Sequence, residues 1–179
     1  MEKLNQLISL CHGQHVYIQT HNFPDPDAIA SAYGLQQLLA LYGVESQLCY
    51  DGRIDRLNAS KMLDTFQIRM APYEDLSSRM KETDPILYVD TQKLAGNTTD
   101  FIGDEVACID HHPTFVPMEY HYQDIRMVGA CASLIAEYYV RSGNTPDRNV
   151  ATALLYGIKM DTLQFTRGVT PLDIEMFGF

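Results

Sequence analysis

Short apolar runs alternate along this chain with longer segments in which apolar residues recur at helical spacing. The short runs have the length and the β-branched or aromatic content of buried strands, and they cover residues 15–20, 44–50, 86–89 and 106–109. The longer segments predict helices over residues 27–42, 130–140 and 148–163. Strands that alternate with helices in this way are typical of an α/β domain, with a mostly parallel sheet flanked by helices.

The length and the charge of the chain limit the kinds of protein that it can be. With 179 residues, of which 46% are hydrophobic, the chain is long enough for one domain with a real core. No apolar run approaches the roughly 18 residues that a membrane-spanning helix requires, and residues 1–11 lack the pattern of a secretory signal. The formal net charge of −10 argues against a general binder of duplex DNA, because neutralising phosphates requires a basic surface.

The cysteines are widely scattered and form no CxxC pair: Cys11, Cys49, Cys108 and Cys131. This spacing is typical neither of a zinc site nor of a disulfide framework, and it indicates reduced thiols. We therefore expect a cytoplasmic protein with no membrane partner.

Residue types that commonly bind metals follow three of the apolar runs, at the point where each predicted strand ends. His21 follows the first run, Asp90 follows another, and residues 110–112 (Asp-His-His) follow a third. The loop just beyond His21 adds Asp25 and Asp27, held between two prolines. Because the carboxyl ends of neighbouring parallel strands lie side by side, we expect these side chains to meet in one crevice.

A further aspartate points to the same crevice from a predicted helix. Asp161 shares the apolar face of Leu154 and Ile158, where a carboxylate is costly to bury unless it is paired or coordinated. If Asp161 joined the aspartates at the strand ends, some of them would have to be protonated unless cations were present. Divalent metal ions resolve both difficulties. Taken alone, residues 25–27 also suit a turn with a helix cap, and we expect Asp27 both to cap its helix and to bind metal.

The motifs that carry these residues resemble the four motifs of the DHH phosphoesterase superfamily, in the expected order. They are residues 21–28 (HNFPDPDA), 88–90 (YVD), 110–112 (DHH) and Asp161. Residues 129–133, which open a predicted helix, also resemble a family feature. The resemblance spans about residues 16–165 and implies a DHH-type catalytic domain. The superfamily includes RecJ-like exonucleases, oligoribonuclease/pAp phosphatases, cyclic-dinucleotide phosphodiesterases and manganese-dependent inorganic pyrophosphatases.

The resemblance implies a site for two metal ions, usually Mn²⁺. The first ion would be held by His21, Asp25 and Asp90, and the second by Asp27, Asp90, His111 and Asp161. Asp90 would bridge the two ions. This mixed set of imidazoles and carboxylates suits Mn²⁺, with Mg²⁺, Co²⁺ or Fe²⁺ as substitutes, and it lacks the thiolates of a structural zinc site.

The resemblance also implies roles for the two other residues of the DHH motif. His112 would contact the substrate phosphate, and Asp110 would orient the cluster. Arg126 and Arg167 are candidate phosphate contacts, because a guanidinium offers a bidentate fork to phosphate oxygens. The favoured interpretation of these two arginines is nevertheless that they are solvated surface charges.

The function that follows is a manganese-dependent phosphohydrolase that attacks its substrate with a water activated by two metal ions. Residues 23–32 look most like the oligoribonuclease/pAp-phosphatase branch or the exopolyphosphatase-related proteins, so short oligonucleotides, pAp or similar small phosphoesters are the expected substrates. Hydrolysis of polyphosphate or pyrophosphate is the alternative within the same chemistry. A non-catalytic nucleotide-binding module is a further alternative, which the complete set of ligands disfavours. A homodimer is possible.

The end of the chain predicts another helix. Residues 170–173 (Thr-Pro-Leu-Asp) combine a cap residue, a proline in the first turn and an acidic third position. We expect residues 1–168 to form the catalytic domain. Residues 169–179 are expected to start a linker helix, with no obvious partner in this chain, that leads to a C-terminal domain absent from it. The alternative is a short terminal helix docked on the domain.

Overall fold

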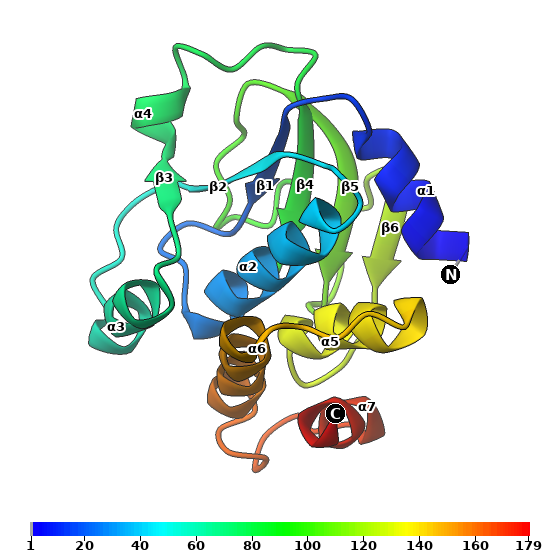
Figure 1. Ribbon diagram of the computed structural model, residues 1–179. Helices are drawn as coiled ribbons and strands as arrows, with labels where there is room; N and C mark the ends of the chain where they lie inside the picture. Colours follow the sequence, from blue (N-terminus) through cyan, green and yellow to red (C-terminus); the bar gives the residue numbers. More distant parts are fainter. Residues whose placement is uncertain (1) are drawn as a thin grey trace.

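The computed structural model of the chain describes residues 2–179. Its centre is a six-stranded sheet in the order β3-β2-β1-β4-β5-β6, with every neighbouring pair parallel. The strands are β1 (Val16–Gln19), β2 (Ser46–Tyr50), β3 (Met70–Pro72), β4 (Pro85–Val89), β5 (Asp104–Asp110) and β6 (Tyr122–Ile125). The predicted α/β class and parallel sheet are confirmed (Figure 1).

The order of the strands explains why the end of β1 faces the end of β4. The chain runs outward from β1 through β2 to β3, and then returns to place β4 on the other side of β1. This reversal leaves a crevice at the carboxyl ends of β1 and β4, which is where open α/β sheets bind ligands. In Figure 1 the arrowheads of β4, β5 and β6 point to the lower part of the view, where α2 also begins.

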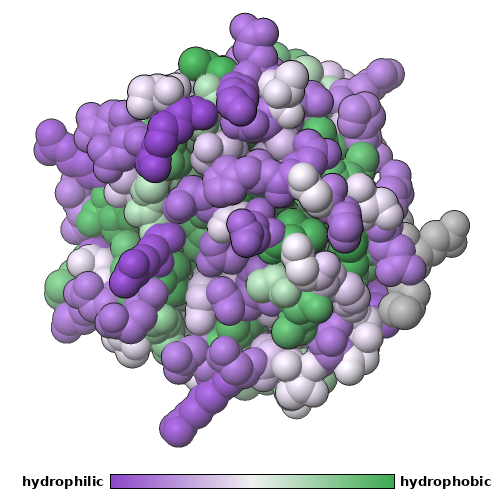
Figure 2. Space-filling model, turned by 45° about the horizontal axis from the view of Figure 1, so that its top comes forward, coloured by the Kyte–Doolittle hydropathy of each residue, from purple (hydrophilic) through white to green (hydrophobic). Residues whose placement is uncertain are grey.

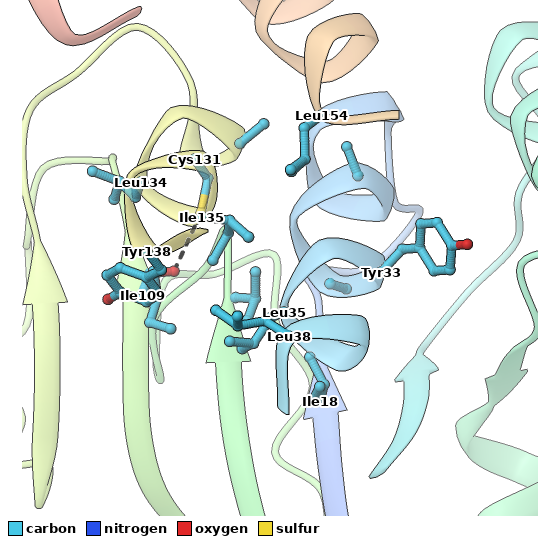
Figure 3. Packing of buried hydrophobic residues seen from close by; sticks show 14 of the residues in the cluster. Ile18, Tyr33, Leu35, Leu38, Ile109, Cys131, Leu134, Ile135, Tyr138 and Leu154 are labelled. Atoms are coloured by element: carbon cyan, nitrogen blue, oxygen red, sulfur yellow. Dashed lines mark hydrogen bonds between the residues drawn. The ribbon is translucent and has the colours of Figure 1, made fainter. Parts of the chain in front are cut away.

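Three long helices pack over one face of the sheet and enclose most of the core: α2 (Pro26–Ala40), α5 (Cys131–Ser142) and α6 (Arg148–Asp161). Figure 3 shows Ile18 of β1 beneath Leu38 of α2, with Ile135 of α5 and Leu154 of α6 in the same cluster. Gly34 lets α6 come close, because a Cβ there would lie 2.9 Å from a methyl group of Leu154.

The opposite face of the sheet carries a smaller apolar cluster. Tyr17, Ile86, Tyr88 and Cys108 are buried there beneath Phe101, which belongs to the loop between β4 and β5, and beneath α4 (Tyr73–Leu76). Helix α1 (Glu2–Cys11) lies beside β6, and α3 (Leu57–Phe66) packs near α2 and α6. Hydrophilic residues cover most of the surface in Figure 2, interrupted by smaller hydrophobic groups.

Several helices and strands of the structure are not predicted from the sequence, for physical reasons. β3 is three residues long, and β6 is an edge strand in which polar residues interrupt the apolar ones. Helix α1 did leave a signal, because Leu4, Leu7, Ile8 and Cys11 recur at helical spacing. Helix α6 ends at Asp161 instead of residue 163, since residues 163–165 adopt left-handed backbone angles, with φ of 47°, 55° and 65°.

The terminal helix α7 (Pro171–Gly178) packs against α5 and α6, so the expectation that it has no partner in this chain is wrong. Its fully buried Asp173 accepts hydrogen bonds from the Gly129 N–H (2.9 Å) and the Ser133 hydroxyl (2.6 Å) at the start of α5. The same carboxylate completes a capping box with Thr170. That this helix begins a linker stays a prediction. Within residues 2–179, no helix combines the length and the apolar content needed to cross a bilayer.

Candidate metal centre

Asp90 lies directly after β4, in a left-handed backbone conformation with φ of 59°. Its N–H still donates to the Ile109 carbonyl of β5 at 2.9 Å, so the sheet pairing continues up to the residue at which the chain turns away. A non-glycine residue with positive φ is uncommon, and such strain is concentrated at functional sites. The side chain of Asp90 is buried, and its Oδ1 atom accepts no hydrogen bond from the described residues.

Asp25, and not Asp27 as expected, caps helix α2. The Oδ1 atom of Asp25 accepts hydrogen bonds from the backbone N–H groups of Asp27 (3.0 Å) and Ala28 (3.2 Å). Pro26 explains the exchange, because proline favours the first helical position and thereby makes the preceding residue the N-cap.

Asp27 is oriented by another helix. Its buried carboxylate accepts hydrogen bonds from the backbone N–H groups of Cys131 (2.7 Å) and Ala132 (3.0 Å), which begin α5. The absence of a side chain at Gly157 allows α6 to approach, since a Cβ there would lie 3.1 Å from Asp27 Oδ1 and 2.8 Å from the Ala30 Cβ. Residues 129–133, singled out in the sequence, thus contribute the donors that fix one carboxylate of the site.

The residues expected to bind metal come together, with His112 beside them, in three overlapping groups. The groups are His21, Asp25 and Asp90; Asp27, His111 and Asp161; and Asp90, His111 and His112, and within each group one ligand atom per residue lies within 4.8 Å of the others. The Nε2 atom of His111 lies 3.2 Å from Asp90 Oδ1 and 3.5 Å from Asp161 Oδ2. The Nε2 atom of His21 lies 3.6 Å from Asp90 Oδ2. Asp90 therefore connects the two expected ligand sets.

Both expected histidine ligands present the same ring nitrogen to the carboxylates. The Nδ1 atom of His21 lies 2.8 Å from the Asn22 carbonyl oxygen, and that of His111 lies 3.0 Å from the Val128 carbonyl oxygen. A carbonyl oxygen only accepts, so each Nδ1 carries a proton, and in the neutral ring each Nε2 directs its lone pair toward the cluster. Metal-binding histidines are oriented by this kind of hydrogen bond.

The electrostatics of the cluster favour bound cations. Burial, together with the charge of neighbouring aspartates, raises the pKa of Asp27, and burial raises the pKa of Asp90 and Asp161. Burial lowers the pKa of His111, but its approach to Asp90 and Asp27 outweighs that effect and raises the pKa to about 10. Without a cation, these groups hold their protons to higher pH than they would in water. The unpartnered Asp90 oxygen and the oxygen and nitrogen donors fit a divalent ion such as Mn²⁺.

Asp110 is fully buried, and it holds the backbone of His111 and the ring of His112. Its Oδ1 atom accepts from the backbone N–H of His111 (2.8 Å) and from Nδ1 of His112 (2.9 Å). The hydrogen bond to Asp110 raises the pKa of His112. Gln92 completes the arrangement, since its amide donates to Asp110 Oδ2 at 2.8 Å and to the His112 carbonyl at 3.1 Å. Sequence reasoning missed Gln92, whose only signal is its position two residues after Asp90.

The two predicted arginines lie in different surroundings. Arg167 is at the site, where its guanidinium donates to the carbonyl oxygen (2.7 Å) and to Oδ1 (3.2 Å) of Asp161. Arg126 donates to both oxygens of Asp124 (2.7 and 2.9 Å) and to Glu137 (2.6 Å), which ties β6 to α5.

Arg56 also lies at the site without having been predicted, and its Nη1 atom is 3.8 Å from Asp25 Oδ2. No motif includes this residue, and only the folded chain brings it to the site.

Comparisons with known proteins place the sequence among related families of proteins. Residues 15–158 match the model of the DHH family, N-terminal domain. An uncharacterised protein of Methanocaldococcus jannaschii is 36% identical over 163 residues, which are 90% of this chain and 33% of the relative. A probable manganese-dependent inorganic pyrophosphatase of Streptococcus suis is 30% identical over 147 residues, covering 80% of this chain and 47% of the relative. The chain thus spans about a third to a half of the length of these relatives.

Solved structures show the same fold. A candidate family II inorganic pyrophosphatase of Methanococcus jannaschii superposes with a TM-score of 0.69 at 25% identity, covering 91% of this chain and 54% of that chain. The exonuclease RecJ bound to manganese gives a TM-score of 0.52 at 14% identity over 96% of this chain and 44% of that chain, which supports the fold alone.

Proposed function

The chain belongs to the DHH family, and on that premise we propose that it is a metal-dependent phosphohydrolase that uses manganese. One observation carries the proposal. Asp90 is shared between two groups of potential metal ligands, and its buried Oδ1 atom has no hydrogen-bond partner among the described residues. Burying a carboxylate oxygen without a hydrogen-bond donor costs free energy. The surrounding carboxylates and imidazoles are metal ligands, so a cation is the partner that suits this oxygen.

We propose that two ions bind in this site. His21, Asp25 and Asp90 would hold one ion, and Asp27, Asp90, His111 and Asp161 would hold the other. When bound, divalent ions lower the pKa of water and offset the charge of phosphate oxygens. The name of the Streptococcus suis relative supports a divalent metal, and it leaves the number of ions in this chain to experiment.

His112 is proposed to donate a hydrogen bond to the substrate phosphate. Its Nδ1 atom is engaged by Asp110, and its side chain is 52% exposed, so Nε2 is available for a ligand. The raised pKa of His112 favours the protonated ring, in which both nitrogens are donors. Asp110 and Gln92 position this ring. Arg126 stays a prediction as a phosphate contact, because a phosphate would have to compete with Asp124 and Glu137 for its guanidinium.

The substrate is proposed to be a small compound with phosphoester or phosphoanhydride bonds. The sequence motif favours short oligonucleotides or pAp, whereas two of the relatives are named as inorganic pyrophosphatases. These names favour the phosphoanhydride alternative over the oligonucleotide one. The complete ligand set counts against a non-catalytic nucleotide-binding module.

A calorimetric titration of the metal-free 179-residue chain with Mn²⁺ tests the proposal first. Uptake of two ions, followed by Mn²⁺-dependent release of phosphate or nucleotide from pyrophosphate, pAp or a dinucleotide, would support it. The comparison among the three substrates would identify the bond that is cleaved. Absence of specific Mn²⁺ uptake would contradict the proposal and favour the binding module.

A further inference from the structure

A cleft of about 380 Å³ opens beside the metal centre, between the start of α2, the start of α3 and the end of α6. Three of the proposed metal ligands line one side of it: Asp25, Asp27 and Asp161. Two arginines from separate segments also line it. Arg56 comes from the loop before α3, and Arg167 from the segment after α6.

Each arginine is paired with a carboxylate that is expected to bind metal. The guanidinium of Arg56 lies 3.8 Å from Asp25, and that of Arg167 lies 3.2 Å from Asp161. The two arginine side chains are 67% and 60% exposed. Exposed ion pairs of this kind contribute little free energy, so either guanidinium can exchange its partner at low cost.

The charges of the site indicate when that exchange occurs. Asp25, Asp27, Asp90 and Asp161 carry four negative charges when ionised, and two divalent ions carry four positive charges. With both ions bound, the metal charges balance the four carboxylates. The positive charges of Arg56 and Arg167 are then no longer neutralised by Asp25 and Asp161. Inorganic anions in the cleft would then face two cations, in a chain whose formal net charge is −10.

We propose that this cleft binds a second phosphate group of the substrate, apart from the phosphate at which hydrolysis takes place. Arg56 and Arg167 hold that group from two sides, because the planar fork of a guanidinium matches phosphate oxygens. The inference rests on the proposed function and deepens it. It selects substrates with two or more phosphate groups, such as pyrophosphate, polyphosphate or pAp, over phosphodiesters that have a single phosphate.

Binding of imidodiphosphate, a non-hydrolysable diphosphate, tests the cleft without turnover. Calorimetry would use the full chain, with free Mn²⁺ held constant by a metal buffer. We expect Arg56→Ala and Arg167→Ala each to weaken imidodiphosphate binding about tenfold, as the loss of a charged hydrogen bond does. Both variants should keep the stoichiometry of Mn²⁺ binding. Arg53→Ala is the matched control, because Arg53 is exposed in the same loop and does not line the cleft.

A second experiment separates this inference from the proposed function. With pyrophosphate as substrate, Arg56→Ala and Arg167→Ala should raise KM, whereas with p-nitrophenyl phosphate their KM should match that of Arg53→Ala. Mn²⁺ uptake without any turnover would contradict the proposed function, and imidodiphosphate binding would still test the cleft. If both arginine variants bind imidodiphosphate as tightly as Arg53→Ala does, the cleft does not hold a second phosphate and the inference is wrong.

Discussion

The Oδ1 atom of Asp90 lies 3.2 Å from the Nε2 atom of His111, and no other donor among the described residues reaches it. The Nδ1 atom of His111 donates a hydrogen bond to the Val128 carbonyl, so Nε2 is the ring nitrogen that faces Asp90. In the metal-free chain the pKa of His111, raised to about 10, keeps a proton on Nε2 between these two atoms, and a bound cation would take the place of that proton.

Replacing Asp90 should abolish metal binding at both proposed positions. We expect Asp90→Ala to take up no Mn²⁺ in a calorimetric titration, because the shared ligand of both groups is lost. Thermal unfolding of the metal-free variant would show that it folds. Uptake of two ions by Asp90→Ala would show that the bridging assignment is wrong.

Replacing His112 should separate catalysis from metal binding. His112 is half exposed and belongs to neither of the two proposed ligand sets, although one ring nitrogen lies within 4.8 Å of ligand atoms of Asp90 and His111. We expect His112→Ala to bind Mn²⁺ as the wild type does and to lose roughly a hundredfold in kcat. This is within the usual range for a residue that donates a proton or a hydrogen bond to the reacting group. A similar loss of Mn²⁺ affinity in this variant would instead make His112 a metal ligand.

The metal-free protein should lose stability as the pH rises above neutrality. The folded-state pKa values of His21 and His111, about 9 and about 10, exceed the ordinary value of 6.5, so the native state binds more protons than the unfolded state. Their contribution is complete below pH 6.5 and disappears as the pH rises through 9 to 10. Melting temperatures of the metal-free chain should therefore fall between pH 7 and pH 10.

Bound Mn²⁺ should reduce this dependence on pH, because a ligated imidazole carries no proton at the coordinating nitrogen. The same reasoning predicts that Mn²⁺ affinity falls at acidic pH, as protons compete for the ligands. Melting curves that do not change with pH in the metal-free chain would contradict the assigned environment of the two histidines.

Replacing Asp173 should destabilise the whole domain. Its fully buried carboxylate accepts from Gly129, Ser133 and Thr170, and Asp173→Ala would leave these donors without partners. We expect a loss of about 3 kcal/mol in the free energy of unfolding, measured by urea titration. Ile174→Ala is the control, because Ile174 is 55% exposed on the same helix and should change stability little.

The sequence predicts those residues of the site that lie at the end of a strand. His21, Asp90 and residues 110–112 each follow an apolar run, so the parallel sheet alone brings them together. The expected cap of α2, Asp27, is the wrong aspartate, although Pro26 is the sequence signal that favours Asp25.

The parts that the sequence does not predict depend on contacts between distant segments. Gln92 and Arg56 are common residue types whose partners are defined only once the chain has folded. Helix α7 docks through a buried carboxylate that binds backbone groups, and a backbone donor leaves no mark in a sequence. Strand β6 has an Asp at its third position, buried in a network with Tyr138 and Arg126, so its pattern does not resemble an apolar strand.

The bonds of Asp173 determine where this domain can be trimmed for expression. A fragment cut at residue 158, where the family match ends, would lose the proposed ligand Asp161. A fragment cut at residue 168 would retain all the proposed ligands, but it would leave Gly129 and Ser133 without their acceptor. Those residues begin the helix whose first N–H groups hold Asp27, so the damage would reach the metal centre. A shortened protein should therefore keep the chain through Gly178.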